Sequence, residues 1–120
     1  MKRDMNLVRE ILLAVEAREH GMGASDLDIK GHSQEEIGYH VYLMGKAELL
    51  VVVETTHLNS QSPEALASGL TWQGHDFLDA ARDPSLWQKA MDKIRMTGSA
   101  LTFEIVKAVL VQLTRQQLDL

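Results

Sequence analysis

The chain has 120 residues, of which 45% are apolar, with 12 Lys and Arg against 17 Asp and Glu, a net charge of −5, and no cysteine. This length supports one domain with its own hydrophobic core and an appendage. The absence of cysteine excludes disulfides, thiol catalysis and zinc sites with cysteine ligands. MKRDMNLVRE at the start lacks the continuous apolar core of a signal peptide, and IVKAVLVQL is far shorter than the roughly 20 residues of a membrane span. We therefore expect a cytoplasmic protein that does not enter membranes.

The first forty-eight residues carry signals for two helices and a short strand. Asp4 is a suitable N-cap, and the apolar residues that follow it have helical spacing, which predicts an amphipathic helix over residues 5–19. LDIKG predicts a small strand before Gly31. Ser33 and Glu36 match a capping box, which predicts a second helix over residues 33–48.

The second predicted helix has two different faces. Ile37, Val41 and Met44 fall on one face, which we expect to be buried. Tyr39, Tyr42 and Lys46 fall on or near the opposite face. Large aromatic side chains on the outward face of a helix indicate contact with a nucleic acid or with another protein.

The remaining sequence predicts a hairpin followed by helices. LLVVVETT and ALASGLTW have the composition of paired strands, and HLNSQSPE has the composition of the loop between them. Thr71 can cap a third helix through QGHDFLDAAR, and Asp83 followed by Pro84 starts a fourth. A last helix is predicted over residues 101–118. We place the main domain at residues 1–82 and a C-terminal helical extension at residues 83–120.

This order of elements resembles a winged-helix domain. IGYHVYLMGKAELLVVVE is similar to the stretch that runs from a recognition helix into the wing. More narrowly, MKRDMNLVREILL, IGYHVYLMGKAELL and LTWQGHDFLDAARDPSLWQKA together resemble an uncharacterised family of small bacterial and prophage proteins. The resemblance implies an α+β, winged-helix-like fold. Its helix-turn-helix is truncated, because the sequence has room for a strand but shows no extra helix before Ser33.

Two interpretations of function remain open. The winged-helix resemblance implies a DNA-associated transcriptional regulator, but residues 21–84, which carry the predicted recognition helix and wing, hold three basic and ten acidic residues. Phosphate contacts by Lys and Arg supply most non-specific DNA affinity, so this charge is unfavourable for DNA binding. The alternative is a protein-interaction module that binds no DNA. The residues expected to contact DNA or a protein partner are Tyr39, Tyr42, Lys46, Lys30 and Arg3.

Catalytic and metal-binding patterns are weak throughout the sequence. The five histidines form no HExxH-like pair, and His40, beside the apolar face of its helix, is interpreted as a hydrogen-bonded residue at the boundary of the core and not as a catalytic base. We expect a non-catalytic binding protein without a metal or a cofactor.

The C-terminal helix predicts a homodimer. Its apolar residues cover an arc of roughly 200°, wider than the stripe that a surface helix buries against its own core. A symmetric dimer would cover the surplus. In the alternative interpretation, the helix that starts at Pro84 covers both sides within one chain. The predicted oligomer contacts are Phe103, Val106, Leu110 and Leu113.

Overall fold

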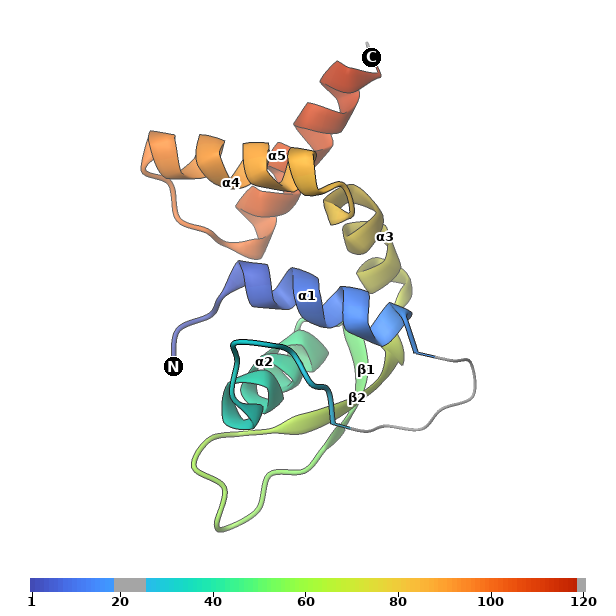
Figure 1. Cartoon of the computed structure of the whole chain (residues 1–120), viewed down its shortest axis with the longest axis vertical. Helices are drawn as coiled ribbons and strands as arrows, with labels where there is room; N and C mark the ends of the chain where they lie inside the picture. Colours follow the sequence, from blue (N-terminus) through green and yellow to red (C-terminus); the bar gives the residue numbers. More distant parts are fainter. Residues whose placement is uncertain (19–25, 119–120) are drawn as a thin grey trace. The chain divides into compact units, whose positions relative to one another are not determined.

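A computed structural model describes residues 1–18 and 26–118, which form five helices and one two-stranded antiparallel sheet (Figure 1). The elements are α1 (Met5–Glu16), α2 (Gln34–Lys46), β1 (Leu50–Glu54), β2 (Ala65–Leu70), α3 (Trp72–Ala81), α4 (Pro84–Thr97) and α5 (Phe103–Gln117). The chain divides into two compact units, Met1–His75 and Asp76–Leu120. The fold is α+β and winged-helix-like, as the sequence indicates.

In the first unit, α1 and α2 pack beside a β-hairpin. The Asp4 carboxylate accepts hydrogen bonds from the Asn6 and Leu7 N–H groups at 2.9 and 3.2 Å and so caps α1. Ser33 caps α2 by accepting from Glu36 N–H at 3.1 Å. The predicted apolar face of α2 is confirmed, because Ile37, Val41 and Met44 are buried. Residue 19, at the predicted end of the first helix, lies outside the described residues.

Close approach between α2 and the hairpin depends on glycine. A Cβ added at Gly45 would lie 2.5 Å from a methyl carbon of Val52 on β1, and a Cβ added at Gly38 would lie 3.3 Å from Glu64 Cβ beside β2. The two glycines are seven residues apart and therefore lie on one side of the helix. Figure 1 shows α2 beside the hairpin, whose loop projects away from α1 and α2.

One local prediction is wrong. The short strand expected in LDIKG does not form: residues 26–29 have no regular structure, and a turn follows at Lys30 and Gly31. The carbonyl of Leu27 accepts from the Gln34 side-chain amide at 2.8 Å, and the carbonyl of Ile29 accepts from His32 N–H at 3.2 Å. These local bonds turn the chain toward α2 in place of a sheet ladder.

The second unit contains the end of α3 with α4 and α5. Phe77, which is 1% exposed, lies edge-on to Trp87 at 6.4 Å between ring centroids and packs against Phe103 at 4.8 Å. Asp83 caps α4, and Gly98 ends it with a left-handed φ of 71°, which glycine adopts without strain. We expected the boundary between domains after residue 82. The two units divide earlier, inside α3, because Phe77 already belongs to the second aromatic cluster.

Candidate functional site: a groove between α2 and the hairpin

The residues expected to contact DNA or a partner come from three segments. Tyr39 and Tyr42 are half-buried on α2 and Lys46 is exposed at its end, whereas Lys30 is exposed in the preceding turn and Arg3 before α1. Lys46 Nζ lies 5.4 Å from the centre of the Tyr42 ring, a cation–π distance. The structure thus joins Tyr42 and Lys46 on one helical face.

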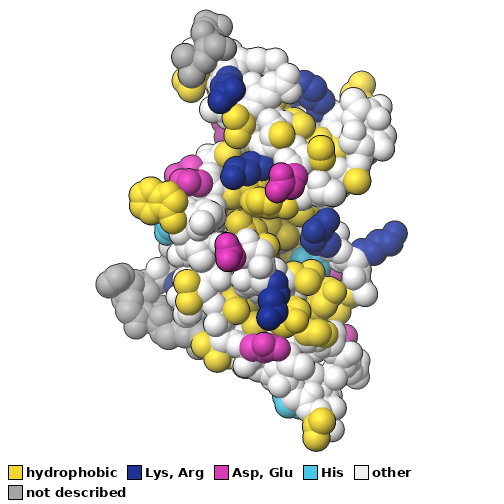
Figure 2. Space-filling view, turned by 180° about the vertical axis from the view of Figure 1, so that it is seen from behind, with side chains coloured by type: hydrophobic (Ala, Val, Ile, Leu, Met, Phe, Trp, Pro, Cys, Tyr) yellow, Lys and Arg dark blue, Asp and Glu magenta, His cyan; other side chains and the backbone are white. Residues whose placement is uncertain are grey.

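The surroundings of that face are acidic. Glu35 and Glu36 occupy the first turn of α2, and the unit Met1–His75 has six Lys and Arg against eleven Asp and Glu, a net charge of −5. In the lower part of Figure 2, Lys and Arg side chains stand among acidic and apolar ones and form no continuous basic surface on the face shown. This distribution is unlike the basic stripe of a typical DNA reader.

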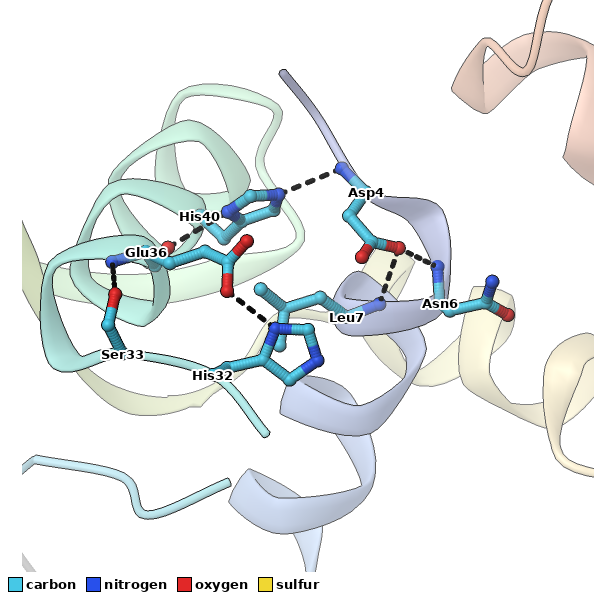
Figure 3. A network of polar contacts seen from close by, with 7 residues as sticks. All are labelled: Asp4, Asn6, Leu7, His32, Ser33, Glu36 and His40. Carbon is cyan, nitrogen blue, oxygen red and sulfur yellow. Dashed lines mark hydrogen bonds and ion pairs between the residues drawn. The ribbon is translucent and has the colours of Figure 1, made fainter. Parts of the chain in front are cut away.

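A polar network fixes the starts of α1 and α2 to each other (Figure 3). His40, which is 0% exposed, accepts from Asp4 N–H at Nε2 over 2.9 Å, and its Nδ1 lies 2.9 Å from the Glu36 carbonyl. Since a carbonyl only accepts, Nδ1 carries the proton and the ring is neutral. His32 Nδ1 lies 2.6 Å from the Glu36 carboxylate. The predicted hydrogen bonding of His40 is confirmed, whereas its predicted place at the boundary of the core is wrong, because the side chain is completely buried where α1 packs on α2.

A groove of about 360 Å³ lies between α2 and the hairpin in the first unit. Its floor is apolar and includes Ile37 and Val41 of α2. Its other lining residues come from the hairpin, from the chain before α2 and from the start of α2; they are Asp26, Leu27, Gln34, Glu35, Gly38, Thr55, His57, Asn59, Ser60, Gln61, Glu64, Ala65, Leu66 and Ala67.

Side chains at the rim of the groove are ordered by local bonds. Thr56 Oγ1 accepts from Glu64 N–H at 2.9 Å across the hairpin loop. His57 accepts from Asn59 N–H at 3.2 Å, and Ser60 Oγ accepts from His57 N–H at 3.0 Å. These bonds link the residues of the loop to one another at the rim. Sequence reasoning treated this loop as a turn only, and its role as a groove wall depends on the approach of α2 at Gly38.

The residues expected to form an oligomer interface occupy different environments. Val106 and Leu110 are 0% exposed, whereas Phe103 and Leu113 are half-buried. α4 packs directly on α5, as in the alternative interpretation in which one chain covers its own C-terminal helix. The large apolar side chains that remain exposed on α5 are Ile105 and Val111, at 39% and 36%. Val106 and Leu110 are core residues of this unit.

Two further features concern metals and membranes. Among residues 1–18 and 26–118, no three His, Asp or Glu side chains are placed so as to hold a metal ion. No helix in the same described part of the chain has the length and apolar character needed to cross a bilayer.

Comparison with known proteins covers almost the whole chain. Residues 2–100 match a family described as "Hypothetical protein (DUF2513)". A protein of Haemophilus influenzae named "Uncharacterized protein" is 32% identical over 119 residues, which are 98% of this chain and 99% of the relative. No solved structure matches the chain. The family match and the relative, both of which extend over α2, the hairpin and the groove between them, show that the chain belongs to the DUF2513 family.

Proposed function

We propose that this protein is a non-catalytic protein-binding module and that the groove between α2 and the hairpin holds its ligand. The observation that carries the proposal is the composition of the groove: an apolar floor with a rim that contains three carboxylates and, among the described residues that line it, neither Lys nor Arg. Pockets that bind specific ligands combine apolar walls with a few placed polar groups.

The negative charge of the groove favours a protein ligand over DNA. Asp26, Glu35 and Glu64 line the groove, and neither Lys nor Arg among its described lining residues offsets them; the basic side chain nearest to these carboxylates in the lining is His57, whose Nε2 lies 3.8 Å from Glu64 Oε1. They attract a cationic ligand and repel phosphates, since potentials across an interface are complementary. Lys46 is the only Lys or Arg of α2, and the seven Asp and Glu of the stretch 26–64 outnumber its two Lys residues.

The hairpin loop also favours a protein partner. Leu58 at its tip is fully exposed, and Figure 2 shows apolar atoms at the lowest point of the view, where this loop projects. Val51 and Val53 are each 53% exposed on β1. A wing that reads DNA presents basic side chains at the tip, whereas exposed aliphatic side chains are typical of contacts with proteins.

The bonding of His57, which lines the groove, and of the buried His40 on α2 favours binding over catalysis. A general base needs a nucleophile or substrate within hydrogen-bond reach. His57 accepts from its own loop through Nδ1, and His40 uses both ring nitrogens to hold α1 on α2. Both histidines thus serve the architecture of the first unit.

Binding measurements test this function. The full chain, labelled with ¹⁵N, is titrated with duplex DNA and with two pools of short peptides, one rich in Lys and Arg and one rich in Asp and Glu. We expect amide shifts around the groove with the cationic pool alone. Glu64→Gln should weaken that binding, whereas Glu104→Gln, a matched change on α5, should leave it unchanged.

Binding of duplex DNA by the outer face of α2 would contradict the proposal. An affinity that falls steeply with salt and is lost in Lys46→Glu would identify the outer face of α2 as a DNA contact and would overturn the proposal.

A further inference from the structure

The helix α5 has a buried side and an exposed side. Val106 and Leu110 are 0% exposed. At about 100° per residue, Ala108 lies on the side of the helix opposite to both of them. The residues around Ala108 are exposed and together form what we call the exposed face of α5; they are Glu104, Lys107, Ala108, Val111, Gln112 and Arg115. They line an open, shallow depression of about 620 Å³.

The spacing along the exposed face is that of a helix with a helical partner. Glu104, Ala108, Val111 and Arg115 follow one another at steps of four, three and four residues. Such alternating steps keep a line of side chains turned toward one neighbouring helix. The small side chain of Ala108, near the middle of the line, permits close approach of that neighbour. Because these residues are exposed in their own chain, the neighbour that the spacing indicates belongs to another molecule.

The charges of this face are complementary to the same face of a second copy. Glu104 lies in the first turn of α5 and Arg115 in the last turn. In an antiparallel pair of these helices, Glu104 of each copy lies opposite Arg115 of the other. Ala108 then lies opposite Val111 about the same midpoint. A two-fold axis produces such reciprocal contacts. In a parallel pair like charges would face each other, so the charges favour the antiparallel arrangement.

We propose that the exposed face of α5 binds the same face of a second copy of this chain in antiparallel orientation. Two pairs between Glu104 and Arg115 fix the register, because polar residues on the contact line of paired helices specify register at a cost in stability. The contacts of Ala108 with Val111 fill the centre. The face shares no residue with the groove between α2 and the hairpin, so changes on it alter self-association and leave peptide binding unchanged.

Apolar residues at both ends of α5 suit the same arrangement. Leu101, before the helix, is 40% exposed, and Leu118, at its C-cap, is 62% exposed. Antiparallel packing places the start of one helix beside the end of the other. Leu101 of each copy therefore lies at the same end of the pair as Leu118 of the other.

The size of the face indicates a reversible dimer. α5 has 15 residues and is therefore about 22 Å long. One pair of such helices buries less than about 1,200 Å², an area typical of weak and transient association. We expect a dissociation constant on the order of 10 to 100 μM.

The helix dipole gives a second reason for the positions of the two charges. An acidic residue in the first turn and a basic residue in the last turn each stabilise a helix on its own. Exchange of the charges separates the two effects. The double variant Glu104→Arg, Arg115→Glu loses the favourable interactions with the dipole but keeps two opposite-charge pairs between the copies. We expect it to be less stable than the wild type and to associate with about the same affinity.

The first test measures self-association of the full chain by sedimentation velocity between about 5 and 500 μM, a range that brackets the expected dissociation constant. The wild-type mass should rise with concentration toward twice the mass of one chain. Glu104→Arg and Arg115→Glu should each weaken association about tenfold, because either change turns two attractive pairs into two repulsive ones. Lys93→Glu, a charge reversal at an exposed residue of α4, is the matched control and should have no effect. A wild type that stays monomeric at the highest concentration, or charge reversals without effect, would overturn the inference.

The second test mixes the two single variants in equal amounts. Copies of either variant repel one another, but in a mixed pair every Arg faces a Glu. We expect the mixture to associate about as tightly as the wild type, with circular dichroism confirming that the helix content of each variant is intact. A mixture no tighter than the single variants would show that Glu104 and Arg115 do not face each other, and would refute the antiparallel register.

Amide shifts of the wild type give a measurement that needs no substitution. On dilution of the ¹⁵N-labelled chain, the amides of Lys107, Ala108 and Val111 should shift, whereas those of the groove should not. If a variant does not fold, these shifts decide the question, because dilution shifts confined to other surfaces would contradict the proposed pairing.

Discussion

His40→Ala tests the network that joins the starts of α1 and α2. The imidazole is completely buried and makes hydrogen bonds of 2.9 Å to Asp4 N–H and to the Glu36 carbonyl. Each hydrogen bond contributes about 1 kcal/mol to stability. The cavity left by the ring adds about 1 to 2 kcal/mol. We therefore expect His40→Ala to lower the free energy of unfolding by about 3 to 4 kcal/mol.

Thermal and urea unfolding followed by circular dichroism measure this loss. For a chain of this size, about 4 °C of melting temperature corresponds to each kcal/mol, so a decrease of about 12 to 16 °C is expected. His75→Ala is the matched control, because His75 is an exposed histidine on a helix and its replacement should change stability by less than about 0.5 kcal/mol. His40→Gln should lie between these values, since the amide oxygen can still accept from Asp4 N–H.

A direct observation of the ring completes the test. Long-range ¹H–¹⁵N spectra distinguish the two neutral tautomers, and the structure requires the proton on Nδ1 and a free lone pair on Nε2. A proton on Nε2, or a loss below about 1 kcal/mol for His40→Ala, would refute the assigned network and with it the account of how α1 is held on α2.

Three further substitutions test packing in the two units. Gly45→Ala places a methyl 2.5 Å from a Val52 methyl carbon, so we expect about 1 to 3 kcal/mol of destabilisation by urea unfolding, and an unchanged midpoint would show that α2 lies farther from β1. Asp83→Ala removes the cap of α4 and should cost about 1 kcal/mol, measured by the fluorescence of the buried Trp87, with exposed Asp92→Ala as control. Leu110→Glu places a charge in a fully buried position and should unfold the second unit in the same fluorescence assay. A folded variant whose light-scattering mass is half that of the wild type would instead restore Leu110 as a dimer contact.

Local chemistry in the sequence determined most of the element pattern. Asp4, Ser33 and Asp83 cap helices as expected, because a side-chain oxygen reaches N–H groups only two or three residues away. The apolar spacing of the second helix likewise identified Ile37, Val41 and Met44 as core residues, since helical periodicity is a property of neighbouring residues.

Tertiary structure decided the features that depend on distant partners. LDIKG has strand composition, yet its carbonyls bond locally to Gln34 and His32, and strand formation depends on the neighbouring strand more than on intrinsic preference. The acceptor of Asp4 N–H is His40, 36 residues away, and no spacing rule joins them. Val106 was expected at a dimer interface but is buried within its own chain. The width of an apolar arc shows how much helix surface must be buried, but it does not show which element buries it. The groove has the same origin, because its lining residues come from α2, the hairpin and the chain before α2, which only the fold brings together.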